Sequence, residues 1–163
     1  MVYVRVLNSG KLPLGQDIVE RRGLSITTNY KDLNGNRLDI SKLQQGQDFV
    51  VTITVSNLKK EAVKDIALTQ IFPSGWDIVN TRFTDFGDTT VSNARYTDIR
   101  DDRVNFYFDL NKAATKGSNK TFTIMLNASY LGKYYLPGTQ AEAMYDNDYF
   151  VRNKGQWITV EKE

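Results

Sequence analysis

The sequence predicts an all-β protein, an antiparallel β-sandwich of about nine to eleven short strands. Apolar and polar residues alternate along much of the chain, as they do in strands that bury one face. Turn-forming residues interrupt this alternation at short intervals, and no window of about 11 residues or more carries a convincing helical period. The chain has 163 residues, 40% of them hydrophobic, which is enough for one domain with its own core.

Three segments alternate most strictly and should form the centre of the sandwich. They are residues 49–56 (FVVTITVS), 103–110 (RVNFYFDL) and 121–128 (TFTIMLNA). In each, apolar side chains occupy every second position, and the residues between them are mostly polar or charged. One face of each strand is therefore predicted to be buried.

Weaker alternation predicts further strands at residues 2–7, 24–31, 64–72, 76–80, 96–100, 133–136, 140–145 and 156–161. Turn signals such as Asn34-Gly35 and Pro137-Gly138 separate them. A single helical turn is expected around residues 40–43. Residues 81–95 are polar and lack a strong pattern, so a surface loop is expected there.

Two parts of the chain differ in pattern. Residues 1–22 are predicted to hold a leading strand, residues 2–7, and a linker, residues 8–22, which contains glycine and proline and has no sustained alternation. Residues 23–163 form the main domain. Because an unpaired alternating strand tends to add to a sheet edge, we expect the leading strand to pair with the domain's own sheet or to mediate a contact between chains.

Composition removes several classes of function. Lys and Arg total 21 against 19 acidic residues, so neither nucleic acid nor an anionic membrane surface is expected as a partner. The sequence has no His and no Cys, which excludes Ser-His and Cys-His catalysis and Cys/His zinc sites within this chain. No apolar run approaches the roughly 18 residues that a membrane helix needs, so no direct membrane insertion is expected. We expect no cofactor and no metal.

Two acidic stretches resemble calcium loops only superficially. Residues 32–36 (DLNGN) place oxygen ligands at alternate positions, but Arg37 and Leu43 stand where such a loop needs Gly and Glu. An Asn-Gly hairpin turn is the better interpretation. Residues 146–148 (DND) fail the same test at Val151, and an Asx-type turn explains them better.

The densest charge cluster consists of Asp98, Arg100, Asp101, Asp102 and Arg103. Paired carboxylates could perform glycosidase chemistry if two of them faced each other about 5–10 Å apart across a cleft. Alternating signs at a turn between two strands are more typical of local salt bridges. The sequence therefore predicts a protein that is not an enzyme, with a hydrolase as a rival hypothesis.

Aromatic residues near strand ends suggest a binding surface. Trp76, Tyr134, Tyr135, Tyr149 and Trp157 could stack on sugars or anchor a protein interface. For Trp76 and Trp157, the alternative is that they simply cap the core. A carbohydrate-binding or adhesive module of a cell-surface protein is therefore an alternative function. It requires the exposed aromatic rings to form a flat, coplanar row.

The most informative segment is residues 133–150 (KYYLPGTQAEAMYDNDYF). It ends one strand with a Pro-Gly turn, starts another, and sets Met144 and Tyr145 before a polar turn. A Met-Tyr pair at a strand end is well placed to contact something outside its own domain. Plain packing within the domain is the alternative.

Four segments in order resemble one family. Residues 23–57, 66–78 (IALTQIFPSGWDI), 98–110 (DIRDDRVNFYFDL) and 134–146 (YYLPGTQAEAMYD) are similar to the C-terminal macroglobulin-like domain, MG10, of bacterial alpha-2-macroglobulins. This domain is equivalent to the receptor-binding domain of the wider family. The resemblance covers residues 23–163 and implies an immunoglobulin-like or macroglobulin-like sandwich.

The resemblance also implies a function. Alpha-2-macroglobulins are protease traps in which an internal Cys-Gln thioester of another domain captures the attacking protease. The terminal domain helps keep water and amines from that bond through its Met-Tyr motif, here Met144 and Tyr145. Residues 2–10 look like the last strand of the preceding CUB-type module. The implied partners are the thioester and CUB-type domains of the same parent chain, with target proteases bound by the full-length protein, in the periplasm or cell envelope of a Gram-negative bacterium.

Overall fold

The computed structural model describes residues 1–7, 9–10, 13–79 and 94–162, and within those ranges it contains thirteen strands and no helix. The all-β prediction is therefore confirmed, with two strands more than the upper bound expected. No helix in these ranges has the length and apolar character needed to cross a membrane. The loop predicted at residues 81–95 lies, up to residue 93, outside the described residues.

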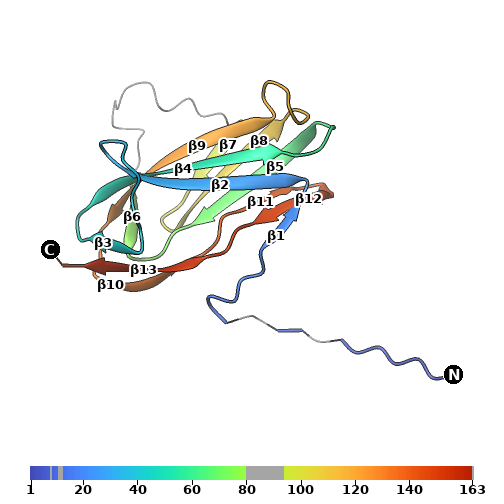
Figure 1. Ribbon diagram of the computed structural model, residues 1–163, viewed down its shortest axis with the longest axis horizontal. Coiled ribbons are helices and arrows are strands. Elements are labelled where there is room, and N and C mark those ends of the chain that lie inside the picture. Colours follow the sequence, from blue (N-terminus) through green and yellow to red (C-terminus); the bar gives the residue numbers. More distant parts are fainter. Residues whose placement is uncertain (8, 11–12, 80–93, 163) are drawn as a thin grey trace.

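The strands form three sheets that build a sandwich (Figure 1). A six-stranded sheet has the order β1-β12-β11-β5-β8-β7, a four-stranded sheet the order β2-β4-β9-β6, and a three-stranded sheet the order β10-β13-β3. Their bounds are β1 Glu20–Arg22, β2 Leu24–Asp32, β3 Lys42–Gln44, β4 Asp48–Asn57, β5 Val63–Ile71, β6 Trp76–Val79, β7 Tyr96–Ile99, β8 Arg103–Leu110, β9 Asn119–Ala128, β10 Gly132–Leu136, β11 Gln140–Ala143, β12 Asp146–Arg152 and β13 Gln156–Glu161.

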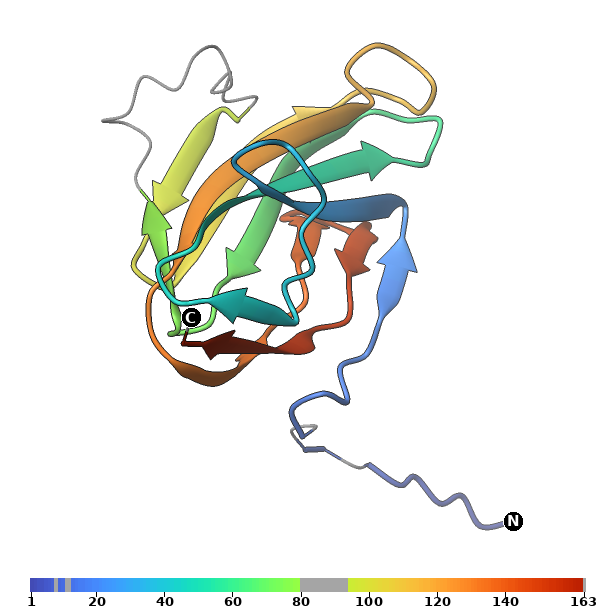
Figure 2. The ribbon, with the colours of Figure 1, turned by 60° about the vertical axis from the view of Figure 1, so that its left-hand side comes forward.

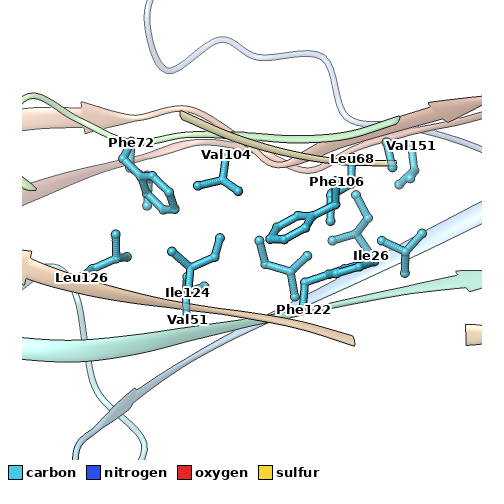
Figure 3. Close-up of a cluster of buried hydrophobic side chains, with 14 of the residues drawn as sticks. Ile26, Val51, Leu68, Phe72, Val104, Phe106, Phe122, Ile124, Leu126 and Val151 are labelled. Atoms are coloured by element: carbon cyan, nitrogen blue, oxygen red, sulfur yellow. The ribbon is translucent and has the colours of Figure 1, made fainter. Parts of the chain in front are cut away.

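The core lies between the six-stranded and four-stranded sheets, and Figure 3 shows its side chains meeting from both layers. Every apolar position predicted for the buried faces of β4, β8 and β9 is buried. Phe106 stacks on Phe122 with ring centroids 4.4 Å apart and an interplanar angle of 21°, which joins the two sheets at their centre. Strict alternation thus identified the strands that carry the core.

Three strands differ from the sequence-based expectations. The helical turn expected at residues 40–43 is wrong, because Lys42–Gln44 form β3 and bury Leu43 while pairing parallel with β13. That pair is the one parallel pair among the named strands; the others are antiparallel. The turn expected at residues 146–148 lies within the first residues of β12, and the expected linker contains β1.

The leading strand is not formed. Residues 2–7 have no strand assignment and are exposed, and Figures 1 and 2 both place the N-terminus far from the sandwich. Their alternating pattern is compatible with a strand, but in this chain they do not lie against the edge of any sheet and therefore pair with none. Their expected pairing with the domain's own sheet is therefore wrong. A contact between chains stays a prediction.

Candidate functional site

Met144 and Tyr145 form the two-residue turn that joins β11 to β12. The side chain before them, Ala143, is buried, whereas Met144 is 47% exposed and Tyr145 is 85% exposed. The Met144 amide donates a hydrogen bond of 3.0 Å to the carbonyl oxygen of Asp65, near the start of β5. The pair therefore forms a tip, fixed through its backbone, that presents two large side chains to the solvent.

Beneath the tip, β12 departs from regular pairing. Glu142 pairs with Phe150, but Ala143 pairs with Asp146, so residues 147–149 are extra on the β12 side. A bulge of this kind bends its strand and sets the direction of the residues next to it. We call residues 146–149 the bulge. An Asx turn lies within it, because the Asp148 amide donates to Asp146 Oδ1 at 3.0 Å.

Arg22 of β1 holds one side of the bulge. Its Nη1 donates to the carbonyl oxygen of Asn147 at 2.6 Å, and its guanidinium carbon lies 5.2 Å from the centroid of the Phe150 ring. The Nε atom of Arg22 lies 2.8 Å from Glu20 Oε1, so the guanidinium is held from its own strand as well. A planar cation with several donors suits such a three-way contact better than an ammonium would.

Lys59, in the connection between β4 and β5, holds the other side. Its Nζ lies 3.4 Å from Asp148 Oδ2 and 4.4 Å from the centroid of the Tyr149 ring. Tyr149, the last residue of the bulge, is buried, and burial raises the pKa of its hydroxyl above the ordinary value of 10. Sequence reasoning missed both Arg22 and Lys59, since no pattern marks a basic residue that contacts a distant bulge.

Gly23 completes the support. Its φ is +63°, and a Cβ atom built on it would lie 2.8 Å from the carbonyl oxygen of Asp148 and 2.9 Å from Tyr149 Cδ1. The backbone of the bulge therefore packs directly on this glycine. The carbonyl of Gly23 accepts the Leu58 amide at 2.9 Å, and the exposed Leu58 side chain adds apolar surface at the same end of the sandwich.

The charge cluster forms local ion pairs. Arg100 Nε lies 2.9 Å from Asp98 Oδ2, and Arg103 Nη2 lies 2.6 Å from Asp102 Oδ2. The hydrogen bond from Arg103 lowers the pKa of the Asp102 carboxyl below its ordinary value. The salt-bridge interpretation is confirmed for these two carboxylates, which face their own arginines rather than each other across a cleft.

The five aromatic residues do not form one surface. Trp76 is only 2% exposed, with its ring 4.9 Å from that of Phe49, which confirms the alternative that it packs on the core. Tyr149 is buried too, so its place on a binding face is wrong. Trp157 is 46% exposed, but its ring lies at 65° to that of Tyr135. The flat row that a sugar platform requires is therefore not formed by this pair.

The two acidic stretches form turns. Asp32 Oδ1 accepts hydrogen bonds from the backbone amides of Asn34 at 2.9 Å and Asn36 at 2.8 Å. The pKa of the Asp32 carboxyl is lowered, chiefly by a hydrogen bond from the Asn36 side chain. The Asx turn at Asp146 is equally clear. Within the described ranges, no three His, Cys, Asp or Glu residues are grouped so that they could hold a metal ion.

Comparison with known proteins gives a consistent result. The family model for the "Bacterial Alpha-2-macroglobulin MG10 domain" matches residues 23–148. Among curated proteins, the alpha-2-macroglobulin of Pasteurella multocida is 28% identical over 127 residues, 77% of this chain and 6% of that protein. The alpha-2-macroglobulin of Rickettsia conorii is 25% identical over 167 residues, 98% of this chain and 8% of that protein. The chain thus spans less than a tenth of the relatives' length.

Solved structures agree on the fold. The chain superposes with a TM-score of 0.77 and 16% identity on native Escherichia coli alpha-2-macroglobulin spanning MG7 to the C-terminus, covering 91% of this chain and 25% of that one. It superposes with a TM-score of 0.74 and 22% identity on Salmonella alpha-2-macroglobulin reacted with methylamine, covering 88% of this chain and 10% of that one.

Proposed function

The chain belongs to the family of bacterial alpha-2-macroglobulin MG10 domains, and we propose that it is a non-catalytic docking domain of a longer protease inhibitor. Its exposed tip, Met144 and Tyr145, covers the thioester of a neighbouring domain and stabilises the conformation that precedes protease cleavage. The observation that carries this proposal is a pair of large side chains held exposed on a rigid turn. In the charge cluster, the carboxylates of Asp98 and Asp102 are each paired with a neighbouring arginine.

The tip has the properties that a shielding contact needs. A thioester survives only while water and amines are kept from it, so its cover must be apolar and closely fitting. Met adapts its shape to an irregular surface, and Tyr supplies a large ring with one polar atom. Together they suit a contact that forms within one protein and can be broken when the protein rearranges.

The proposed partners lie in the same parent chain. The thioester domain would receive the tip, and residues 1–22 would be the end of a CUB-type module that precedes this domain. Target proteases would be bound by the full-length protein, in the periplasm or cell envelope. The relatives come from Gram-negative bacteria, and a Salmonella relative has been solved after reaction with methylamine, a small amine of the kind that such a shield must exclude.

The test uses the longer protein and its reaction with methylamine. Replacing Met144 or Tyr145 by Ala should speed the loss of protease capture by about tenfold, the effect of ~1.4 kcal/mol of lost docking energy. The rate is followed by exposing the protein to methylamine and then measuring covalent capture of trypsin.

Tyr130→Ala is the matched control. Tyr130 is an exposed tyrosine whose amide donates a hydrogen bond to the Gly75 carbonyl. Gly75 follows the C-terminal end of β5, whereas the tip is bonded near the start of that strand. Its replacement should leave the inactivation rate unchanged. If Met144→Ala and Tyr145→Ala also leave that rate unchanged, the tip is not a shield.

A further inference from the structure

The segment before the domain, residues 13–22, is fastened to the sandwich at two points, and we call it the strap. At the first point, Asp17 Oδ2 accepts hydrogen bonds from the Tyr135 hydroxyl and, at 2.9 Å, from the Gly155 amide. At the second, β1 pairs antiparallel with β12, with Arg22 opposite Phe150. Figure 1 shows β1 at the edge of its sheet, beside β12, with the chain leaving the body just before it.

No buried apolar side chain anchors the strap. The three residues of β1 are Glu20, Arg21 and Arg22, none of them buried. The apolar residues just before them, Ile18 and Val19, are exposed. Since the hydrophobic effect does not hold the strap in place, its attachment rests on polar contacts and a short ladder, which open more easily than a packed strand.

Within the strap, Arg22 reaches furthest toward the tip. Its hydrogen bond of 2.6 Å to the Asn147 carbonyl fixes the bulge two residues after Tyr145. Lys59 holds the same bulge from the body of the domain through Asp148. The bulge therefore has one basic side chain holding it from the body of the domain and one from the strap, while the backbone of the tip is held separately by Asp65.

We infer that Arg22 is a positioning residue for the tip, and that the tip keeps its docking conformation only while the strap is paired with β12. A preceding module that moves would pull on the strap, detach β1 and remove the Arg22 support from the bulge. Movement of the strap would thereby loosen the contact surface next to it. This coupling rests on the proposed function for its biological meaning, but it is a physical property of the chain that can be measured separately.

The experiment is amide hydrogen exchange on this chain, with Arg22→Ala compared with Arg21→Ala. The two arginines are neighbours on the same three-residue strand, and no side-chain partner of Arg21 is found among the described residues. In Arg22→Ala, exchange at the Met144 and Asp148 amides should rise about tenfold, as expected for the loss of one charge-assisted hydrogen bond from a locally opening segment. Arg21→Ala should leave these amides unchanged.

Two further readouts separate positioning from general destabilisation. The slowest amides of β4 should exchange equally in both variants, because the core is not touched. Arg22→Lys, which keeps a cation near the bulge, should recover part of the protection. Equal exchange at Met144 and Asp148 in the two alanine variants overturns the inference, and so does a rise in Arg22→Ala that the β4 amides share.

The longer protein then distinguishes the two hypotheses. If Arg22→Ala loosens the tip in this chain, it should also speed inactivation by methylamine, as Tyr145→Ala does. If Tyr145→Ala has no effect on inactivation while the exchange result holds, the shielding function fails and the coupling between strap and tip stands. If the exchange result fails while Tyr145→Ala speeds inactivation, the shield stands and the coupling is lost.

Discussion

Replacing Gly23 by Ala should destabilise the chain more than replacing a turn glycine with open space beside it, such as Gly35. Gly23 has a φ of +63°, and its missing side chain leaves room for the Asp148 carbonyl, which would lie 2.8 Å from a Cβ atom. The obstacle is backbone, so it cannot rotate away as a flexible side chain would. Cδ1 of the Tyr149 ring would lie 2.9 Å from the same Cβ atom, so the Cβ atom cannot shift toward that side either.

The expected magnitude has two parts. A residue with a Cβ in the left-handed region costs roughly 1–2 kcal/mol relative to glycine. Forcing an extra methyl group into a packed contact typically costs about 1–3 kcal/mol. Their sum, about 2–5 kcal/mol, is a large part of the ~5–15 kcal/mol by which a domain of this size is stable. Gly23→Ala should therefore shift the unfolding midpoint strongly.

The assay is urea unfolding followed by circular dichroism, with Gly35→Ala as the control. Gly35 also has a positive φ, +85°, but nothing lies within 4 Å of the position that its Cβ atom would take. Its substitution carries only the conformational cost of about 1–2 kcal/mol, partly offset by about 0.4–1 kcal/mol of reduced unfolded-state entropy. Equal losses of stability in the two variants would refute the claim that the bulge packs on Gly23.

Two other predictions concern the same end of the sandwich. Asp65 has a φ of +53° while its carbonyl accepts the Met144 amide, so Asp65→Val should be less stable than Asp65→Gly by about 1–2 kcal/mol in urea unfolding. Burial raises the pKa of the folded Tyr149 above 10, so between pH 10 and that raised pKa the folded state keeps a proton that the unfolded state has lost. The stability from this group is complete below pH 10 and falls as the pH rises through the folded pKa. Tyr149→Phe should remove that part of the alkaline decline in unfolding free energy, and an unchanged decline would contradict the assignment.

Local patterns predicted the core well, because a strand that buries one face shows alternating apolar and polar residues in its own sequence. In residues 49–56, Phe49, Val51, Ile53 and Val55 were predicted to face the core, and all four are buried in β4. The same logic failed for residues 2–7, which alternate but meet no sheet edge. It also failed for β1 and β3, three-residue strands that exist because a partner strand far along the chain passes beside them.

Some residues of the candidate site could be found from the sequence, and others could be found only from the fold. Met144 and Tyr145 could be singled out from the sequence because the motif stands at a strand end before a polar turn. Arg22 could not, since its role depends on a bulge that places the Asn147 carbonyl within 2.6 Å. For Trp76 the sequence left two interpretations open, because its position near a turn says nothing of the Phe49 ring against which it packs. Contacts made across sheets need the fold before they can be assigned.

The residues of the tip are unusual for a two-residue hairpin turn. A two-residue hairpin turn favours Asn-Gly or a similar pair, because the turn types that match strand twist need a positive φ. Among the described residues other than glycine, only Asp65 and Ala114 have a positive φ, so the turn of Met144 and Tyr145 is not of that kind. The bulge absorbs the resulting mismatch between β11 and β12, and it in turn requires Gly23, Arg22 and Lys59 beneath it. A sequence that departs from favourable turn chemistry and surrounds the departure with supports is typical of a functional surface. The supports are therefore as much part of the site as the two side chains that they hold exposed.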